Sequence, residues 1–339
     1  MWNFLSVRTT ASAFAISTLL ALGACGGGGG GDDGPPAIVS PPTTAATLGA
    51  STTEAAAAAQ GAVESATKAV ELYATLGQGP VPITAQGEAA LSRALPGASS
   101  REQALARQTI SCVDFLGISD CSGTVTIDTN LSDSSTVAVP GTYITVIFNA
   151  LRATVEGDSL ALDGAMRIDF LTTFDLNSTS FANQRLELTL QDFGGSAEGV
   201  SFGPYNVRAL IEYDANEAST VTMDGVRIAG IENIAVADGL NYGLTTVALR
   251  RAVWSSASAY VDYNFANWTV AAGRPSVGSA ATISASANSI GVVVTAEEAV
   301  QVVYAVTITV GGVGTAYTVT AAYPQGGVAP TYTAVPAGG

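Results

Sequence analysis

From residue 123 to the C-terminus, hydrophobic and polar residues alternate with a period of two. The clearest runs place their apolar residues at Met166, Ile168 and Phe170, at Leu186, Leu188 and Leu190, and at Val207, Ala209, Ile211 and Tyr213. Alternation of this kind is typical of antiparallel strands with one face buried and the other in water. We therefore expect a mainly β protein built on a large antiparallel sheet or sandwich-like β-domain, with roughly a dozen or more strands.

Glycine-containing turn signals divide this alternating region. Asp163-Gly164 and Asp224-Gly225 each lie between apolar alternating runs, a setting typical of two-residue hairpin turns. Their flanking residues are alike, so they are either a duplicated sheet module or two independent hairpins, and we favour the second interpretation. Residues 302–322 carry no charge, but alternating threonines and interrupting glycines predict a third hairpin there rather than a membrane span.

The region before residue 112 has helical spacing instead. Ser51-Thr52-Thr53-Glu54 is a capping-box sequence, and an alanine-rich stripe at three- and four-residue steps predicts a helix to about residue 76. Shorter helices are predicted at residues 85–95 and from residue 99 to about residue 109. The sheet is therefore expected to follow about two or three short, alanine-rich helices.

Two cysteines lie where the helical pattern gives way to the strand pattern. Cys112 and Cys121 are separated by eight residues, which favours a local disulfide in an exported protein. Closing so short a loop stabilises a fold by roughly 2–3 kcal/mol. A redox-active pair would need surroundings that favour the thiolate, and the neighbouring Asp114 and Asp120 disfavour it. We predict the disulfide.

Residues 1–24 have the pattern of a signal peptide, with one arginine before an apolar stretch too short for a comfortable membrane span. The following Leu22-Gly23-Ala24-Cys25 resembles the lipobox of bacterial lipoproteins. This resemblance implies cleavage before Cys25, a diacylglycerol on its sulfur and a fatty acyl chain such as palmitate on its amine. Gly26 stands where an aspartate would imply retention at the inner membrane, so the resemblance implies the outer membrane. The alternatives are ordinary secretory cleavage with a free Cys25 thiol and a retained membrane anchor.

These patterns divide the chain into consecutive parts. Residues 25–50, rich in glycine, proline and threonine, are expected to form a flexible tether after the signal peptide. A helical region is expected at residues 51–111, an antiparallel β-domain at residues 112–273, and a C-terminal β-hairpin region with a tail at residues 274–339. The whole layout resembles glycine-tethered outer-membrane lipoproteins of Gram-negative bacteria with no assigned activity.

The composition excludes several kinds of chemistry. Histidine is absent, which excludes Ser-His-Asp and Cys-His catalysis and histidine-ligated metals. The formal net charge is −15 and the arginines are scattered, so nucleic acid is not an expected partner. Gly199-Val200-Ser201-Phe202-Gly203 matches the nucleophile-elbow pattern, but without a histidine we interpret Ser201 as a turn residue. Lys68 is interpreted as a solvated helix residue, and no catalytic residue is predicted.

Two acidic stretches contain oxygen ligands of the kind that calcium prefers. They are Asp128, Asn130 and Asp133, and Asp214, Asn216 and Glu217. Neither has the spacing of a calcium-binding loop, so we interpret them as solvated turn residues and keep Ca²⁺ as the lesser alternative. No other metal or cofactor is predicted, apart from the covalent lipid on Cys25.

The segment 260–268 concentrates aromatic residues. On a strand, Val261, Tyr263 and Phe265 would form the buried face. The opposite face would then combine aromatic rings with amide and carboxylate groups, as carbohydrate and peptide sites often do. The predicted ligand-binding residues on that face are Tyr260, Asp262, Asn264 and Trp268. The alternative is a set of half-buried aromatic residues at a sheet edge.

Together these features favour a lipid-anchored envelope protein with a non-catalytic binding or structural role at the outer membrane, on its periplasmic or cell-surface face. The expected partners are the membrane, through the anchor, and an envelope protein, glycan or lipid. The first alternative is a carrier that encloses a lipid or other hydrophobic ligand inside a curved sheet. The second is a hydrolase that uses two carboxylates about 5–10 Å apart.

Overall fold

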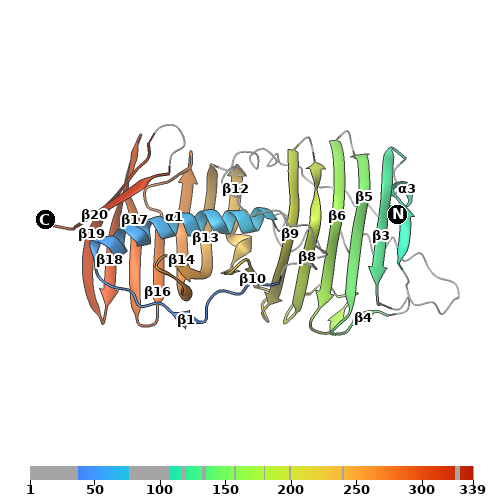
Figure 1. Cartoon of the computed structure of the whole chain (residues 1–339), viewed down its shortest axis with the longest axis horizontal. Helices are drawn as coiled ribbons and strands as arrows, with labels where there is room; N and C mark the ends of the chain where they lie inside the picture. The colour runs from blue at the N-terminus through green and yellow to red at the C-terminus, as the bar shows by residue number, and fades with distance from the viewer. Residues whose placement is uncertain are drawn as a thin grey trace.

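One large antiparallel sheet of 18 strands dominates the fold, as the alternating pattern predicts. The structure, a computed structural model, describes residues 37–75, 107–116, 119–131, 135–155, 158–178, 180–197, 200–238, 240–324 and 329–338. The strands lie side by side along the long axis of the molecule, and helix α1 (Thr52–Thr75) crosses those of the C-terminal half (Figure 1). The expected mainly β fold is confirmed.

The sheet has two broad halves. The N-terminal half comprises β2 (Gln108–Ser111), β3 (Cys121–Thr129), β5 (Tyr143–Val155), β6 (Asp158–Phe170), β8 (Arg185–Ala197) and β9 (Val200–Tyr213). The C-terminal half comprises β13 (Asn241–Val253), β14 (Ser256–Ala271), β16 (Ala280–Ala285), β17 (Asn288–Glu298), β18 (Gln301–Val310), β19 (Val313–Ala322) and β20 (Thr331–Pro336).

Short elements complete the architecture. The broad halves are joined by β10 (Ser219–Met223) and β11 (Val226–Ala229), which we call the waist. After η2 (Ile231–Asn233), β12 (Ile234–Asp238) also pairs with β13, while β15 (Arg274–Pro275) and β1 (Thr44–Ala45) pair with β14. The remaining elements are α3 (Cys112–Leu116) and a two-stranded sheet of β4 (Val137–Ala138) and β7 (Phe174–Asp175). Among the described residues, no helix is long and apolar enough to cross a membrane.

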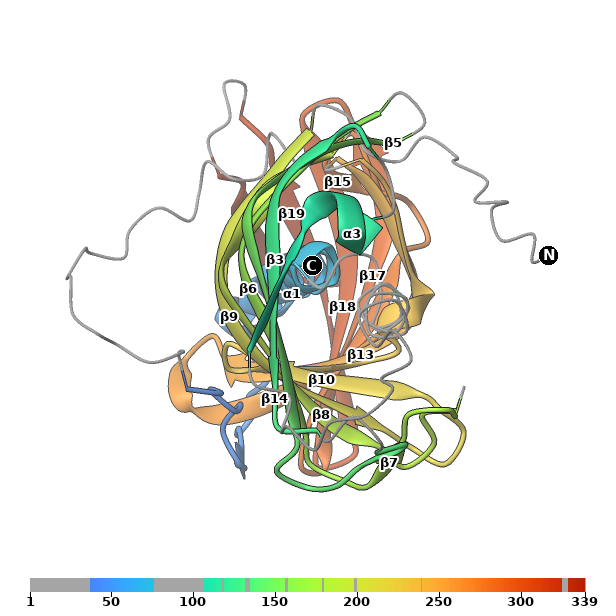
Figure 2. The ribbon, with the colours of Figure 1, turned by 90° about the vertical axis from the view of Figure 1, so that its right-hand side faces the viewer.

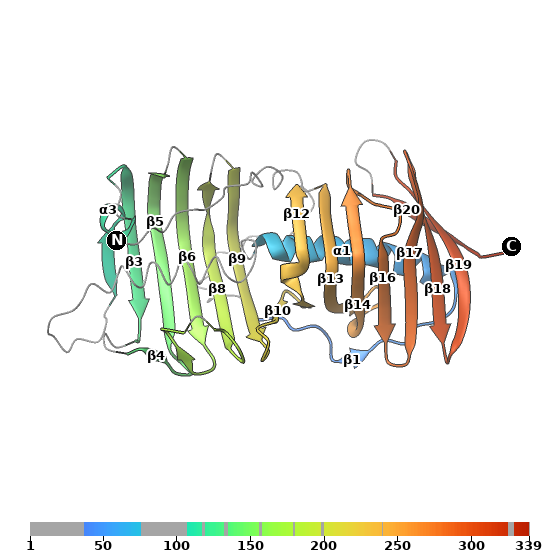
Figure 3. The same cartoon turned by 180° about the vertical axis from the view of Figure 1, so that it is seen from behind.

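Helix α1 lies within the curve of the sheet and covers one of its faces (Figures 2 and 3). The predicted helix start is confirmed, because the Glu54 amide donates to the Ser51 hydroxyl at 3.1 Å. The expected alanine stripe is buried, and its small side chains let the helix backbone approach the strands closely. The fully buried alanines are Ala55, Ala58, Ala59, Ala62, Ala66 and Ala69. Helix α1 ends at Thr75, close to the end predicted at about residue 76, and is 24 residues long.

A line of positive-φ residues crosses the N-terminal half, and we call it the crease. Its members on β3, β5, β6, β8 and β9 are Gly123, Ala150, Gly164, Asp192 and Gly203. The pairing register shifts at the crease between each pair of neighbouring strands. Extra residues in a strand bend the sheet locally and increase its twist.

The crease corrects one predicted turn. Asp163-Gly164 is not a hairpin, because β6 continues through it and pairs with β5 on one side and β8 on the other. The Asp163 carboxylate accepts the Ala150 amide at 2.7 Å, which fixes the bulge instead of a turn. Asp224-Gly225 does form the predicted hairpin turn, with Met223 opposite Val226. The two Asp-Gly segments therefore have different structures, and neither the duplication nor the pair of hairpins describes them.

Other boundaries also differ from those predicted. Residues 108–111, at the end of the expected helical region, form β2, where β-branched Thr109 and Ile110 pair with β3. The β14–β16 pairing joins strands on either side of residue 273, so the C-terminal hairpins extend the same sheet. The hairpin predicted within residues 302–322 is confirmed as β18 and β19.

The described part of the expected tether, residues 37–50, packs against the fold. Leu48 is buried, and the Ala46 amide donates to the Tyr260 carbonyl at 2.9 Å. This part of the chain is not a free tether because it contains apolar side chains, Ala46 and Leu48, which are buried against the fold. Cys25, the signal peptide and the helix predicted at residues 85–95 lie outside the described residues.

The predicted disulfide between Cys112 and Cys121 is present, with the two sulfur atoms 2.03 Å apart. It joins the start of α3 to the start of β3, at the end of the sheet. Phe115 of α3 packs edge-on against Phe148 of β5, with ring centroids 6.5 Å apart. The disulfide and this aromatic contact together hold α3 against β3 and β5.

Candidate ligand-binding site

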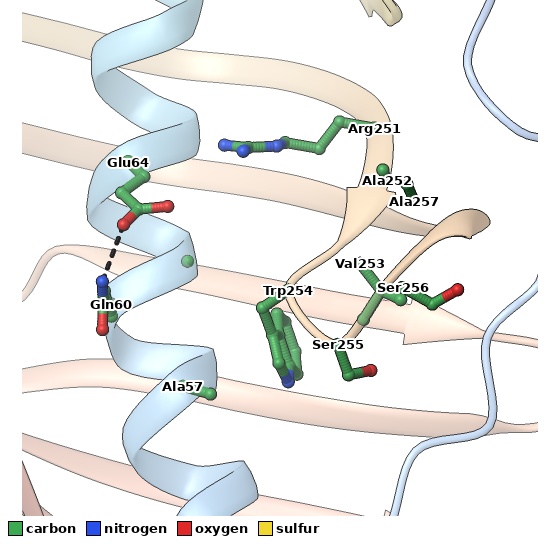
Figure 4. A pocket seen from close by; sticks show the side chains of 11 residues that line it. Ala57, Gln60, Glu64, Arg251, Ala252, Val253, Trp254, Ser255, Ser256 and Ala257 are labelled. Carbon is green, nitrogen blue, oxygen red and sulfur yellow. Dashed lines mark hydrogen bonds between the residues drawn. The ribbon is translucent and has the colours of Figure 1, made fainter.

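A pocket of about 710 Å³ lies between α1 and the turn that joins β13 to β14 (Figure 4). Its helix wall includes Gln60, Gly61 and Glu64, and its sheet wall is residues 251–257. The Arg251 side chain extends from β13 toward the helix, and Trp254 lies at the turn (Figure 4). The volume is within the range of about 300–1,000 Å³ typical of small-molecule sites.

The local backbone explains why the pocket exists. Val253 pairs with Ser256, whereas the preceding Ala252 pairs with Tyr260, so the β14 strand carries additional residues beside the turn. Such a bulge redirects the side chains around it. On the opposite wall, Gly61 provides space, because a Cβ there would lie 2.6 Å from Tyr263 Oη and 3.2 Å from Trp254 Cε3.

The start of α1 lies beside the Trp254 side chain. Hydrogen bonding from the Trp254 side chain and the Gly49 backbone acts on the Glu54 carboxylate. The amide of Glu54, not its carboxylate, makes the capping hydrogen bond with Ser51. Burial raises the pKa of Glu54, and these two hydrogen bonds oppose that rise.

The two adjacent arginines of β13 face opposite sides of the sheet. Arg250 forms a bidentate ion pair with Asp262 at 2.7 and 2.8 Å, and its guanidinium lies 3.8 Å from the Tyr260 ring centroid. Arg251 points toward α1, where its guanidinium contacts the Ser65 hydroxyl at 3.4 Å. Seven of the nine arginines in the described ranges form ion pairs, and Arg251 does not.

The helix wall carries the opposite charge. Glu64 is exposed on α1 and accepts a hydrogen bond from the Gln60 amide at 2.8 Å. Glu64 and Arg251 both line the pocket, yet they form no ion pair with each other within the described structure. The pocket therefore presents an acceptor and a donor of opposite charge on facing walls, together with an indole ring.

Tyr263 lies behind this pocket in the core. Burial raises its pKa to about 12, although a hydrogen bond to Ser65 and the positive charge of Arg251 oppose the rise. The Tyr263 hydroxyl is therefore a neutral donor or acceptor at physiological pH. Tyr263 is buried on β14, and its hydroxyl lies close to Gly61 of α1.

Of the sequence-predicted ligand residues, Tyr260, Asp262 and Asn264 share the outer face of β14, and Trp268 does not. Tyr260 and Asp262 engage Arg250 on the outer face, and Asn264 is exposed on that face. Trp268 is fully buried on the other face, so its predicted placement is wrong. The reason is Asn267, whose φ of 52° interrupts the alternation two residues after Phe265.

Side chains of the two candidate calcium-binding stretches form hydrogen bonds with nearby backbone groups. Asp214 accepts the amides of Asn216 and Ala218 at 2.7 and 2.9 Å, and Asn130 bonds the backbone of Gly141 and Tyr143. Asp133 lies outside the described residues. In the part of the chain that the structure covers, no group of three or more Cys, Asp or Glu side chains could hold a metal ion. Ser201 lies on β9 opposite Ser196, not in a turn.

Comparison with known proteins finds no family model, curated protein or solved structure that matches the chain. Our sequence interpretation missed the pocket, although one signal was present: Arg250-Arg251 is the chain's one pair of adjacent basic residues, and alternation directs one of them to each face.

Proposed function

We propose that this protein is a lipid-anchored envelope protein that binds a small polar ligand, without chemical conversion, in the pocket between α1 and the β13–β14 turn. The observation that supports binding is the unpaired guanidinium of Arg251 in a pocket that also contains Trp254 and Glu64. A few polar groups around an aromatic surface are typical of small-molecule sites. The lipobox-like sequence at Cys25 supports the anchor and the outer-membrane location.

The alternatives have less support. A hydrophobic-ligand carrier needs an apolar cavity inside the curved sheet, but in the C-terminal half α1 fills that space with fully buried alanines such as Ala59 and Ala66. A hydrolase of the glycosidase type needs two carboxylates across a cleft. Glu64 is the one carboxylate among the side chains that line the pocket. Binding without conversion is therefore the function that this site supports best.

The binding role can be tested on the full chain, purified in mild detergent, by thermal unfolding with a panel of amino acids, peptides, sugars and lipids. A ligand at a hundred times its dissociation constant stabilises a protein by about 2.7 kcal/mol. We expect a polar compound to raise the unfolding temperature of the wild type but not of Ala57→Trp, which fills the pocket. Glu71→Gln, on the same helix outside the pocket, is the matched control.

Two results would contradict the proposal. The first is a panel in which no compound stabilises the wild type, or in which Ala57→Trp responds as the wild type does. The second is a stabilising compound that mass spectrometry finds converted to product, which would make the protein an enzyme. The anchor is tested separately: Cys25→Ala should release the chain from the membrane fraction, and continued membrane retention would disprove lipidation at Cys25.

A further inference from the structure

We propose that the ligand of this pocket is a zwitterion, a small molecule that carries both an ammonium and a carboxylate group, such as a dipeptide with free ends. This inference rests on the proposed function, because it assumes that the pocket is a binding site. It follows from three observations: an unpaired cation on the sheet wall, an anion on the helix wall, and an aromatic ring that lines the same pocket (Figure 4).

The sheet wall would bind the carboxylate. The Arg251 guanidinium has five N–H donors, and one contact, to the Ser65 hydroxyl at 3.4 Å, is present. The neighbouring Arg250 shows what this chain does with an arginine of structural role, since its Nε and Nη2 both donate to Asp262. A bidentate guanidinium–carboxylate pair is the strongest polar contact that Arg251 could make.

The helix wall would bind the ammonium. Glu64 accepts one hydrogen bond, from Gln60 at 2.8 Å, and a carboxylate has room for several more. The Trp254 ring lines the same pocket, and aromatic rings attract cations at their faces. An ammonium group between Glu64 and Trp254 would therefore meet both a charge and a π-face.

Charge decides between the ligand classes. The chain has a formal net charge of −15, which repels anionic ligands at a distance, while Arg251 inside the pocket repels a plain cation. A zwitterion has no net charge and matches both walls at once. The pocket, at about 710 Å³, is larger than a single amino acid needs, so a dipeptide or tripeptide is the better fit.

The test is isothermal titration calorimetry on the full chain in detergent, with L-alanyl-L-alanine as the probe. Its N-acetylated and C-amidated forms each remove one charge, and a neutral disaccharide represents the uncharged alternative. We expect L-alanyl-L-alanine to bind, and each capped form to bind about tenfold or more weakly, because hydrogen bonds between charged groups contribute that much. The disaccharide should not compete.

Variants assign each end of the probe to a wall. Arg251→Gln should weaken L-alanyl-L-alanine by about tenfold and remove the difference between the free and amidated C-terminus. Glu64→Gln should do the same for the free and acetylated N-terminus. Arg250→Gln and Glu71→Gln are the matched controls, since they change the same residue types outside the pocket. Thermal unfolding of every variant establishes that it is folded.

The outcomes separate this inference from the proposed function. Absence of L-alanyl-L-alanine binding, equal binding of the capped forms, or an equal loss in Arg250→Gln would each overturn the zwitterion. Binding of the disaccharide, abolished by Trp254→Ala, would overturn the zwitterion and leave a non-catalytic binding function intact. If the thermal panel finds no ligand of any class, the proposed function fails and takes this inference with it.

Discussion

Replacing Gly164 by alanine tests whether the crease shapes the N-terminal half of the sheet. Gly164 has a φ of +91°, a conformation that side chains rarely adopt. A Cβ there would lie 2.7 Å from the Phe193 Cα and still closer to the Asp192 carbonyl oxygen. Both neighbours are backbone atoms of β8, so no side-chain rotation can relieve the overlap.

The magnitude follows from these two effects. Holding alanine at this φ costs about 1–3 kcal/mol. Displacing the β8 backbone adds about 1–3 kcal/mol, as overpacking does in a buried core. The expected loss in the free energy of unfolding is therefore about 2–6 kcal/mol, a large share of the roughly 5–15 kcal/mol that stabilises a typical domain.

The assay is urea denaturation of the full chain, followed by circular dichroism, with Gly291→Ala as the control. Gly291 lies in β17, and a Cβ there would have no neighbour within 4 Å. Its replacement should be neutral or stabilising by up to about 1 kcal/mol. If Gly164→Ala and Gly291→Ala unfolded within about 0.5 kcal/mol of each other, the strain argument and the assigned role of the crease would both be wrong.

Three further outcomes are expected. Burial raises the pKa values of Tyr213, Tyr242 and Tyr263 to about 12, so their contribution to stability is complete below about pH 10. Between about pH 10 and 12 each tyrosine should lower the free energy of unfolding by up to about 1.4 kcal/mol per pH unit. Urea midpoints that stay constant across this pH range would contradict the prediction. Gly61→Ala should lower the free energy of unfolding by about 1 kcal/mol, because overlap with the Tyr263 hydroxyl exceeds the gain in helix propensity, and a more stable variant in the same assay would refute this. The buried Tyr304 hydroxyl has no hydrogen-bond partner in the described structure, so Tyr304→Phe should raise the unfolding free energy by about 1 kcal/mol, with a clear loss as the opposing result.

The features predicted correctly depend on local chemistry. The helix start at Ser51 follows from a hydrogen bond between residues three apart in the chain. The β18–β19 hairpin follows from an alternating run with glycines at its centre. The disulfide follows from the short spacing of Cys112 and Cys121. Each of these features is settled by residues close together in the chain, so a single sequence can indicate it.

The features that the sequence did not reveal depend on distant strands. The same Asp-Gly dipeptide is a turn at residue 224, where β10 pairs with β11, and a bulge at residue 163, where β6 continues between β5 and β8. Trp268 moved to the buried face because of one left-handed residue, Asn267. The pocket forms where α1 meets the β13–β14 turn. These two elements are far apart in the chain: Ser65 of α1 and Arg251 of β13 are separated by 186 residues.

The waist has a mechanical consequence. Broad neighbours such as β13 and β14 share a ladder from Tyr242 to Val253, whereas β11 is joined to β13 through residues 227–229 alone. The ion pair of Lys68 with Asp224 at 2.9 Å also joins the waist to α1. We therefore expect bending between the two halves to concentrate at the waist, while α1 and its pocket move with the C-terminal half.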